Sequence, residues 1–518
     1  MMQNQEYVFG ANIIENLTTG MYQDSRVIYR EYIQNACDQI DKAIAQGLLN
    51  VGEGKIEIWL DFDKRTISIE DNATGIPASA FRETLGNVAD SDKEIGKDKG
   101  FRGIGRLCGL AYCKEVRFIS KARGEDVISV LRCDAVKMRN LIDENSRGVK
   151  RTASEILRAI YDFDQMPTDE IDNHFFKVEL IGINDENTDL LNTKAIREYL
   201  SFVAPVPYKN TFFYRKDIKD FAKKLNYNID EYDVRLDGTP IFKEYTTIFK
   251  KADKTTLDEI FGVEFREFKD SDGNLFAWMW IGLTQFKQAI PKINQMRGFR
   301  LRKENIQIGG EDALQKLFKE DRGNSYFVGE VFAVSKDLIP NSQRDYFNEN
   351  PSRAYFEKTL RQFFNDELHK VYYDGSTVNA AYKKIDAYAT KQAEFKEKDK
   401  QGAFVNPEHR SAEYERVMVA KKDAETAKNK IEKTKEKADG MMVRVIEQIE
   451  KEHPPKKIID ISPPNAKQAI KPPLRVDKLT TYNRNERKLI SKIFDIIISA
   501  TDEKTAEKII SKIEDGLI

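Results

Sequence analysis

Three polar side chains whose chemistry suits acid–base catalysis and metal binding lie at helical spacing near the start of the sequence. Glu31, Asn35 and Asp38 stand at positions i, i+4 and i+7 of the stretch 25–46, which predicts one amphipathic helix with Ser25 as candidate N-cap. A carboxylate can serve as a general base, and carboxylate and amide oxygens are hard ligands of the kind Mg2+ prefers. Taken alone, the pattern also fits an ordinary solvated helix face.

Another carboxylate stands at the end of a predicted strand. Residues 55–60 and 66–70 alternate in the way of two strands joined by a turn. Ile67, Ile69 and Asp71 share one face of the second strand, which predicts that Asp71 is buried. A buried carboxylate requires a partner, and two alternatives stay open: a loop N–H or arginine of the protein, or the exocyclic amine of a purine.

A glycine motif precedes a helical run further along the chain. Gly100, Gly103 and Gly105 follow a polar stretch, residues 90–99, that predicts a mobile loop. Glycines at a loop-to-helix junction let backbone N–H groups approach an anion. A dinucleotide-binding fold requires a strand directly before the glycines, so the polar stretch excludes a Rossmann interpretation.

In this order the motifs resemble those of the GHKL ATPases, the superfamily of gyrase, the ninety-kilodalton heat-shock chaperones, histidine kinases and MutL. The chaperones are the most similar. YREYIQNACDQIDK resembles their first motif, LGNVADS the segment that opens their lid, and GFRGIG the glycine motif that closes it. The resemblance implies an α+β protein that begins with a GHKL (Bergerat) α/β sandwich, hydrolyses ATP to ADP and phosphate, and uses Mg2+ as cofactor.

The same resemblance implies a role for each motif residue. Glu31 would be the general base for water, and Asn35 would bind Mg2+ beside the nucleotide. Asp71 would contact adenine, and Asp38 would lie close to the nucleotide. The other implied nucleotide-binding residues are Gly75, Ile76, Gly100, Phe101, Arg102, Gly103, Ile104 and Gly105.

Two positions depart from the family pattern. Ala73 stands where the family usually has its first glycine after the aspartate, and its methyl group narrows the expected adenine pocket. HFFKVEL, which begins at His174, stands where the family usually has Gly-Thr before a strand. The threonine that would support Asp71 is therefore missing.

A distant segment adds an arginine to this set. VSKDLIPNSQRDYFNEN, residues 334–350, resembles the middle-domain loop with which the same chaperones deliver an arginine to the ATP γ-phosphate, and Arg344 is the match. A guanidinium in that place stabilises charge on the transferring phosphoryl oxygens. The alternative is an ion pair with a surface carboxylate such as Asp345. RGFRLRKENIQIGG, from Arg297, resembles a middle-domain strand pair.

Shifts in composition divide the chain into five predicted segments. The first ends where Pro205 and Pro207 interrupt a helical pattern, and the second mixes strand-like runs with helices around a core that includes Trp278 and Trp280. The segments are a GHKL ATP-binding domain (1–205), a middle domain with the arginine loop (206–375), a helical or coiled-coil segment (376–453), a proline-rich linker (454–478) and a C-terminal helical interaction segment (479–518).

The last three segments differ from a globular core. A seam of small apolar residues at heptad spacing, from Val417 to Val445, indicates a coiled coil or a helical hairpin. Three Pro-Pro pairs predict an extended linker. The final stretch carries an apolar stripe that includes Leu489 and Ile493, which requires a second copy or a partner protein to cover it.

Bulk composition excludes several classes of protein. A net charge of −1 with 33% charged residues shows no bias toward nucleic acid or membrane. No secretory signal and no membrane-spanning run is recognisable. The four cysteines form no CxxC pair and histidine is scarce, so a zinc site is not expected, and free thiols indicate a cytoplasmic protein.

The sequence thus predicts a cytoplasmic ATP-driven clamp. ATP would bind the first domain, the lid Asp90–Gly105 would close, and Arg344 would swing in from the second domain. A homodimer and a protein partner or client are expected, and free-standing prokaryotic proteins of this kind are often linked to phage defence. The alternative is a DNA-associated clamp of MORC or MutL type, which the mildly basic helical segment does not favour. A histidine kinase is not expected, because no phosphoacceptor helix precedes Glu31.

Overall fold

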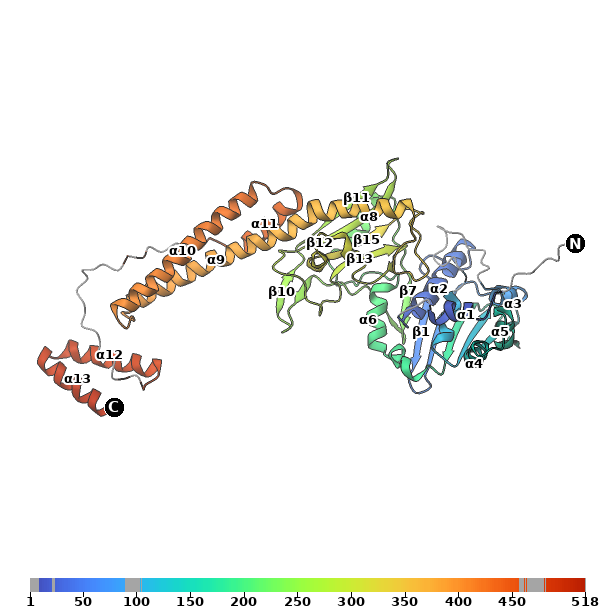
Figure 1. Ribbon diagram of the computed structural model, residues 1–518, viewed down its shortest axis with the longest axis horizontal. Helices are drawn as coiled ribbons and strands as arrows, with labels where there is room; N and C mark the ends of the chain where they lie inside the picture. The colour runs from blue at the N-terminus through green and yellow to red at the C-terminus, as the bar shows by residue number, and fades with distance from the viewer. Residues whose placement is uncertain are drawn as a thin grey trace. The chain divides into compact units, whose positions relative to one another are not determined.

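The chain separates into two compact units, Met1–Tyr372 and Tyr373–Ile518. The computed structural model describes residues 9–20, 24–88, 103, 105–455, 461, 463, 479 and 481–517. The first unit holds two large β-sheets with helices, and the second unit is helical (Figure 1). The chain is therefore an α+β protein, and the fold class expected from the sequence is confirmed.

An eight-stranded sheet forms the N-terminal part of the first unit. Its neighbours pair antiparallel except for β1 and β7, which are parallel. Ile56 and Ile58 on β1 are fully buried, whereas the next residue, Trp59, is half exposed. This alternation is typical of an antiparallel sheet with one covered face. In spatial order the strands are β5 (Tyr161–Pro167), β4 (Val127–Asp134), β3 (Glu115–Lys121), β6 (Phe175–Ile181), β2 (Thr66–Asp71), β1 (Lys55–Asp61), β7 (Asp233–Leu236) and β8 (Thr239–Pro240).

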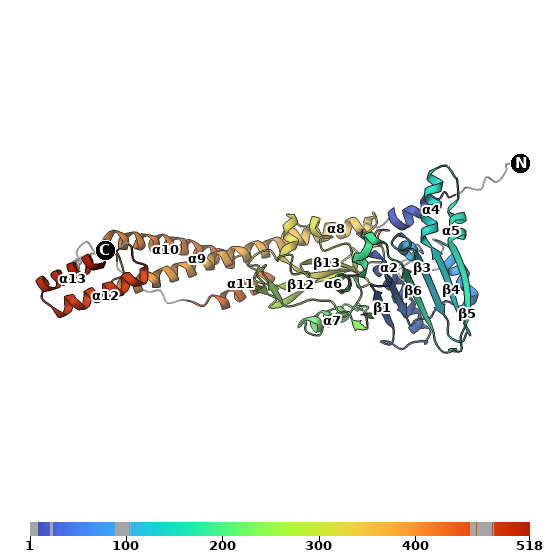
Figure 2. The same ribbon diagram turned by 90° about the horizontal axis from the view of Figure 1, so that it is seen from below.

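Helix α2 (Val27–Ala45) is the longest element packed on this sheet (Figure 2). The predicted apolar side of the helix is confirmed, since Tyr29, Ile33 and Ile40 are buried in the core. The prediction of Ser25 as N-cap is wrong, because the helix starts at Val27 and the Ser25 hydroxyl donates a hydrogen bond to the Asp189 carboxylate at 3.1 Å. The other helices of this part are α1 (Asn12–Glu15), α3 (Ala78–Gly86), α4 (Ala135–Ser146), α5 (Ala153–Ile160), α6 (Thr193–Val203) and the 3-10 segments Gly105–Ala111 and Asp185–Leu191.

A five-stranded sheet forms the rest of the first unit. Trp278 and Trp280 are fully buried on its central part, as predicted, and the strand pair expected from Arg297 onward is present as β13 and β14. β7 and β8 follow residue 205 yet extend the first sheet, and the domain boundary at residue 205 stays a prediction. The sheet order is β11 (Gly262–Lys269), β12 (Leu275–Leu283), β15 (Val328–Ala333), β13 (Gly298–Lys303) and β14 (Ile306–Ile308), accompanied by β9 (Ile248–Lys250), β10 (Thr256–Glu259), α7 (Arg215–Lys224) and α8 (Pro351–Phe363).

The second unit contains two separate groups of helices. Within it, α9 (His369–Lys400), which begins in the first unit, folds back on α10 (Pro407–Lys435) as a hairpin, and α11 (Gly440–Glu452) follows. The Arg410–Asp399 ion pair joins the two long helices at 2.7 Å, and the predicted apolar seam is buried from Val417 to Ile431. The other group is α12 (Arg484–Ala500) and α13 (Glu503–Leu517). None of the helices in the described ranges has the length and apolar content needed to cross a membrane.

A buried charged cluster centred on Glu330 stabilises the second sheet. The Glu330 carboxylate on β15 is inaccessible to solvent and accepts hydrogen bonds from Arg302 Nε at 2.7 Å and from Lys243 Nζ at 3.1 Å. Tyr245 and Trp280 donate to the same carboxylate at 3.2 Å. Burial raises the pKa of this carboxyl, but the charges of Arg302 and Lys243 outweigh burial and hold the pKa below its usual value.

We predict that Glu330→Gln lowers the free energy of unfolding by about 3–5 kcal/mol, because it leaves two buried cations without their carboxylate. Chemical denaturation measures this change. The matched control is Glu320→Gln, which removes an exposed carboxylate paired with Arg322 and costs about 1 kcal/mol or less. Equal effects of the two substitutions would contradict the role given to the cluster.

Candidate active site

The polar stripe of α2 faces the interior of the first unit. Glu31 and Asp38 are buried and Asn35 is half-buried, so the solvated-face interpretation of this stripe is wrong. A helix this deeply covered keeps polar side chains only where they have polar partners. The stripe is therefore the first wall of the candidate site.

Arg344 is the partner of Glu31. Its Nε donates to Glu31 Oε1 at 2.8 Å, and both side chains are more than nine-tenths buried. The two residues are 313 positions apart, so this ion pair joins the loop that follows β15 to α2. The Asp345 carboxylate accepts a hydrogen bond from Asn341. Two residues predicted to act together thus lie in direct contact.

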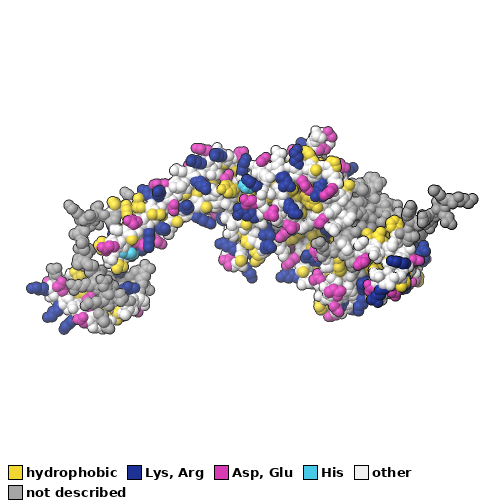
Figure 3. Space-filling model, in the orientation of Figure 1, with side chains coloured by type: hydrophobic (Ala, Val, Ile, Leu, Met, Phe, Trp, Pro, Cys, Tyr) yellow, Lys and Arg dark blue, Asp and Glu magenta, His cyan; other side chains and the backbone are white. Residues whose placement is uncertain are grey.

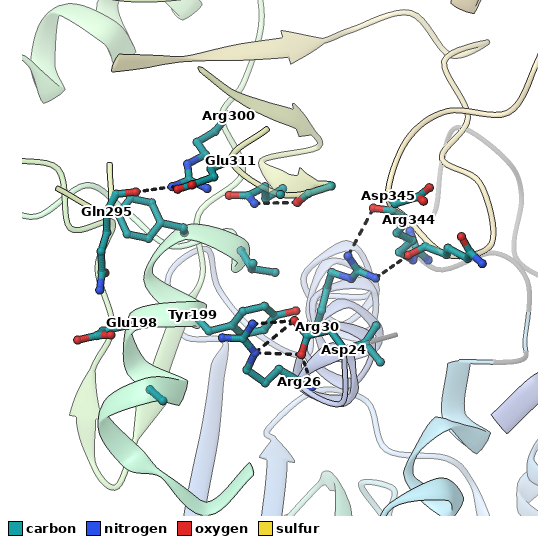
Figure 4. A pocket seen from close by; sticks show the side chains of 18 of the residues that line it. Asp24, Arg26, Arg30, Glu198, Tyr199, Gln295, Arg300, Glu311, Arg344 and Asp345 are labelled. Atoms are coloured by element: carbon teal, nitrogen blue, oxygen red, sulfur yellow. Dashed lines mark hydrogen bonds and ion pairs between the residues drawn. The ribbon is translucent and has the colours of Figure 1, made fainter. Parts of the chain in front are cut away.

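Arg30 is a residue of the site that the sequence analysis missed. Its two terminal nitrogens donate to the main-chain carbonyls of Gln343 at 3.1 Å and Arg344 at 3.5 Å (Figure 4). The Arg344 carbonyl also accepts from Gly309 N–H at 2.9 Å, and Arg344 has a φ of 55°, in the left-handed region. No motif marks an arginine whose partners are backbone carbonyls more than three hundred residues away. Arg30 therefore holds the arginine loop in a strained conformation.

Gly105 brings the glycine motif to the same carboxylate. A Cβ built on Gly105 would lie 2.3 Å from Glu31 Oε2, so any side chain at this position would collide with the proposed base. The next residue is also tied to α2, because Tyr32 donates its hydroxyl hydrogen to the Arg106 carbonyl at 3.0 Å. Gly105 is needed here because of a close approach to Glu31, which the spacing of the motif did not reveal.

Asp71 lies at the end of β2 and is buried, as its position after Ile67 and Ile69 predicts. Its Oδ1 accepts a hydrogen bond from Ala73 N–H at 3.0 Å, so the loop N–H alternative is present in the structure. Burial raises the pKa of this carboxyl to about 8, against the smaller opposing effect of the Ala73 hydrogen bond. One loop N–H leaves carboxylate lone pairs for an additional donor such as an exocyclic amine.

The loop after Asp71 is fixed by contacts on each side. Thr74 donates to the Gln39 side chain on α2 at 2.9 Å, and Ile76 N–H donates to Ser120 at 2.7 Å. Gly75 has a φ of 62°, and a Cβ on it would lie 2.0 Å from a main-chain oxygen of β3. This rigid loop connects the end of β2 with the polar stripe of α2.

The two positions that depart from the family pattern contact each other. His174 Nδ1 lies 2.6 Å from the carbonyl oxygen of Ala73. The imidazole thus contacts the loop next to Asp71 from the residue just before β6. Whether Asp71 still contacts a nucleotide stays a prediction, but its loop has an alternative support.

The remaining predicted residues are placed only in part. Gly103 has a φ of 65°, which favours glycine. Gly100, Phe101, Arg102, Ile104 and nearly all of the predicted lid, Asp90–Gly105, lie outside the described residues.

The residues present fit a Mg2+ ion held jointly with a nucleotide. Within the described ranges no group of three His, Cys, Asp or Glu side chains could hold a metal by itself. Asn35 offers a hard amide oxygen one helical turn from Glu31, half-buried on the same stripe. Mg2+ commonly takes one or two protein ligands and completes its shell with phosphate oxygens and water.

Comparison with known proteins agrees with this geometry. Residues 25–165 match the family described as histidine kinase-, DNA gyrase B-, and HSP90-like ATPase. The chain is 23% identical over 410 residues to the chaperone protein HtpG of Fusobacterium nucleatum, which covers 71% of this chain and 58% of that protein. It is 36% identical over 77 residues to HtpG of Coxiella burnetii, 14% of this chain and 12% of that one. HtpG of Orientia tsutsugamushi is 28% identical over 145 residues, 24% of this chain and 23% of that one.

The fold and these matches define the class of the N-terminal part: the chain carries a GHKL-type ATPase domain. More particularly, it is distantly homologous to the HtpG (Hsp90) chaperones over 71% of its length. The chain spans less than two thirds of the HtpG proteins that it matches.

The buried position of Asp71 predicts a pH-dependent stability difference. With a pKa of about 8 when folded and an ordinary pKa of 3.8 when unfolded, the Asp71 carboxyl binds more protons in the folded chain than in the unfolded chain between these values. Wild-type stability therefore falls as pH rises through this window, and Asp71→Asn removes that loss. The variant should gain in melting temperature relative to wild type from pH 5 to pH 8.5.

Thermal unfolding of both proteins at several pH values measures the difference. Asp63→Asn, in the exposed turn between β1 and β2, is the matched control and should show a constant difference from wild type. A melting-temperature difference for Asp71→Asn that does not change with pH would contradict the buried, proton-binding carboxyl.

Proposed function

We propose that this protein is an ATP-hydrolysing molecular clamp that couples the docking of the Arg344 loop on α2 to turnover. The contact between Arg344 Nε and Glu31 Oε1, 2.8 Å long and buried, carries this proposal. It joins a segment of the second sheet to the carboxylate proposed as general base in the first. Hydrolysis then depends on contact between the first sheet's helix α2 and the Arg344 loop of the second sheet.

The role proposed for each site residue comes from the sequence resemblance, and the positions of the described residues support it. Glu31 accepts the proton of the attacking water, and Arg344 orients this carboxylate and stabilises charge on the γ-phosphate. Asp71 accepts a hydrogen bond from the adenine amine, Asp38 lies close to the nucleotide, and the Gly75–Ile76 turn passes the purine. Asn35 contributes the protein ligand to Mg2+, which when bound neutralises phosphate charge. The glycine motif, Gly100 to Gly105, faces the phosphates.

The proposed purpose of the cycle is to remodel or signal to a protein partner. On α12, Leu489, Ile493 and Ile496 are each more than two-fifths exposed and lie at i, i+4 and i+7, on one face. An exposed apolar stripe of this kind is typical of a protein-binding face, either for a partner or for a homodimer. The proposed setting, a cytoplasmic role in phage defence, rests on the sequence resemblance.

A DNA-associated clamp is the less favoured function. On the face shown in Figure 3, Lys and Arg side chains are interspersed with Asp and Glu along the helices of the second unit. Nucleic-acid binding requires a basic patch or stripe. Affinity for DNA that falls steeply with salt would favour this alternative.

We predict that Glu31→Gln binds ATP but hydrolyses it about a hundredfold to ten-thousandfold more slowly, since it loses the base while keeping an acceptor for Arg344. Arg344→Gln should also bind ATP and turn over slowly, by up to about a thousandfold. Phosphate release at saturating ATP, beside calorimetric ATP affinity, measures both effects.

The double variant tests whether the pair acts as one unit. Because Arg344 contacts Glu31 directly, Glu31→Gln/Arg344→Gln should be scarcely slower than Glu31→Gln alone. Arg322→Gln, an exposed arginine paired with Glu320, is the control and should keep the parent rate. Parent-rate hydrolysis by either single variant would refute the assigned role.

A further inference from the structure

A cavity of about 510 Å3 lies on the side of α2 next to the arginine loop. One wall comes from helices, with Arg30 of α2, the preceding residue Arg26 and Tyr199 of α6. The other wall comes from the second sheet, with Arg300 of β13 and Gln307 of β14 (Figure 4). Glu31, Asn35, Asp38 and Asp71 do not line it, but Arg344 does, so the cavity adjoins the proposed nucleotide site. Its size is in the range of small-molecule sites.

Arg300 brings an incompletely paired cation into this cavity. Its side chain is 93% buried and stacks on Phe202, with the guanidinium 4.9 Å from the ring centre. One terminal nitrogen donates to the Gln295 carbonyl and lies 3.7 Å from Glu311, but Nε has no partner among the described residues. Glu311 is shared with Arg297 at 2.9 Å, and burial lowers the pKa of Arg300. A buried guanidinium with an unpaired Nε and only a shared carboxylate nearby is stabilised by an added anion.

Gln307 adds an acceptor of hydrogen bonds. It is 3% exposed, and its Nε2 donates to the Gly309 carbonyl at 2.8 Å. Its Oε1 is buried and has no partner among the described residues. A buried amide oxygen without a hydrogen bond destabilises the folded protein, and a hydrogen bond from a ligand hydroxyl or amine removes this cost.

The other charged side chains of the wall leave a small excess of positive charge. The lining residues include the cations Arg26, Arg30, Lys292, Arg300 and Arg344 and the carboxylates Asp24, Glu198, Glu311 and Asp345. Arg26 is neutralised by Asp24 at 2.8 Å. Arg30 is occupied at its terminal nitrogens by the carbonyls of Gln343 and Arg344, and its Nε lies 3.8 Å from Glu31. Arg30 and Arg300 both line the cavity, and each has a buried Nε that no hydrogen bond uses within the described part of the chain.

We propose that this cavity is a binding site for a small hydroxylated anion, either a phosphate ester or a hydroxy-carboxylate. The anionic group lies against Arg300 and Arg30, and the hydroxyl donates to Gln307 Oε1. Because the walls include residues of α2 and Arg344, the ligand bridges α2 and the arginine loop.

Isothermal calorimetry on the full-length protein with ribose 5-phosphate and with citrate tests the site. A saturating non-hydrolysable ATP analogue is present throughout, so that binding at the proposed nucleotide site is not measured. Binding of ribose 5-phosphate alone identifies a phosphate-ester site, and binding of citrate alone a hydroxy-carboxylate site. No binding of either probe in the presence of the analogue overturns the proposal.

Variants locate the binding. Arg300→Gln should weaken the bound probe at least about tenfold, since it removes a charge-assisted hydrogen bond. Gln307→Leu removes the Oε1 acceptor, together with the bond from Nε2 to the Gly309 carbonyl, and changes no charge. It should weaken binding as well, which keeps the test open if Arg300→Gln fails to fold. Arg322→Gln makes the same charge change on an exposed surface and should leave affinity unchanged. Unaltered affinity in folded Arg300→Gln or Gln307→Leu overturns the assignment.

Discussion

The buried ion pair between Glu31 and Arg344 constrains how the two sheets of the first unit are arranged. A carboxylate and a guanidinium that are both more than nine-tenths buried are stable only together, because either one alone would be an uncompensated charge away from water. The pair joins α2 to a loop of the second sheet, so the positions of the two sheets are coupled through it. The left-handed conformation of Arg344 is tolerated for the same reason.

Helix α2 can hold Glu31 in place for this ion pair because the helix is covered on nearly every side. Its apolar residues pack in the core of the first sheet, Gly105 lies against Glu31 where a Cβ would collide, and Gln39 contacts the loop after Asp71. These contacts hold different sides of the helix in place. The proposed base and the proposed metal ligand therefore lie on a helix that cannot rotate without breaking several buried interactions.

Local features of the site could be predicted from the sequence, and its long-range contacts could not. The alternation of Ile67, Ile69 and Asp71 predicted a buried carboxylate, and the period of α2 predicted its apolar side. The start of α2 was misjudged, because Ser25 has a tertiary partner, Asp189, that competes with the cap. The contact of His174 with Ala73 joins two residues about a hundred positions apart, and no local pattern specifies such a pair. Long-range partners of this kind depend on tertiary packing.

Arg30 and Glu31 are consecutive, and this adjacency links the two sites of the first unit. Neighbouring residues on a helix point about 100° apart, so Glu31 and Arg30 lie on different faces of α2. Glu31 faces the proposed nucleotide site, and Arg30 faces the cavity. Both contact the same loop, one through the Arg344 side chain and the other through its carbonyl. A ligand that pulls on Arg30 therefore acts on the backbone that carries Arg344. Arg30 thus connects the cavity to the residue that forms the ion pair with Glu31.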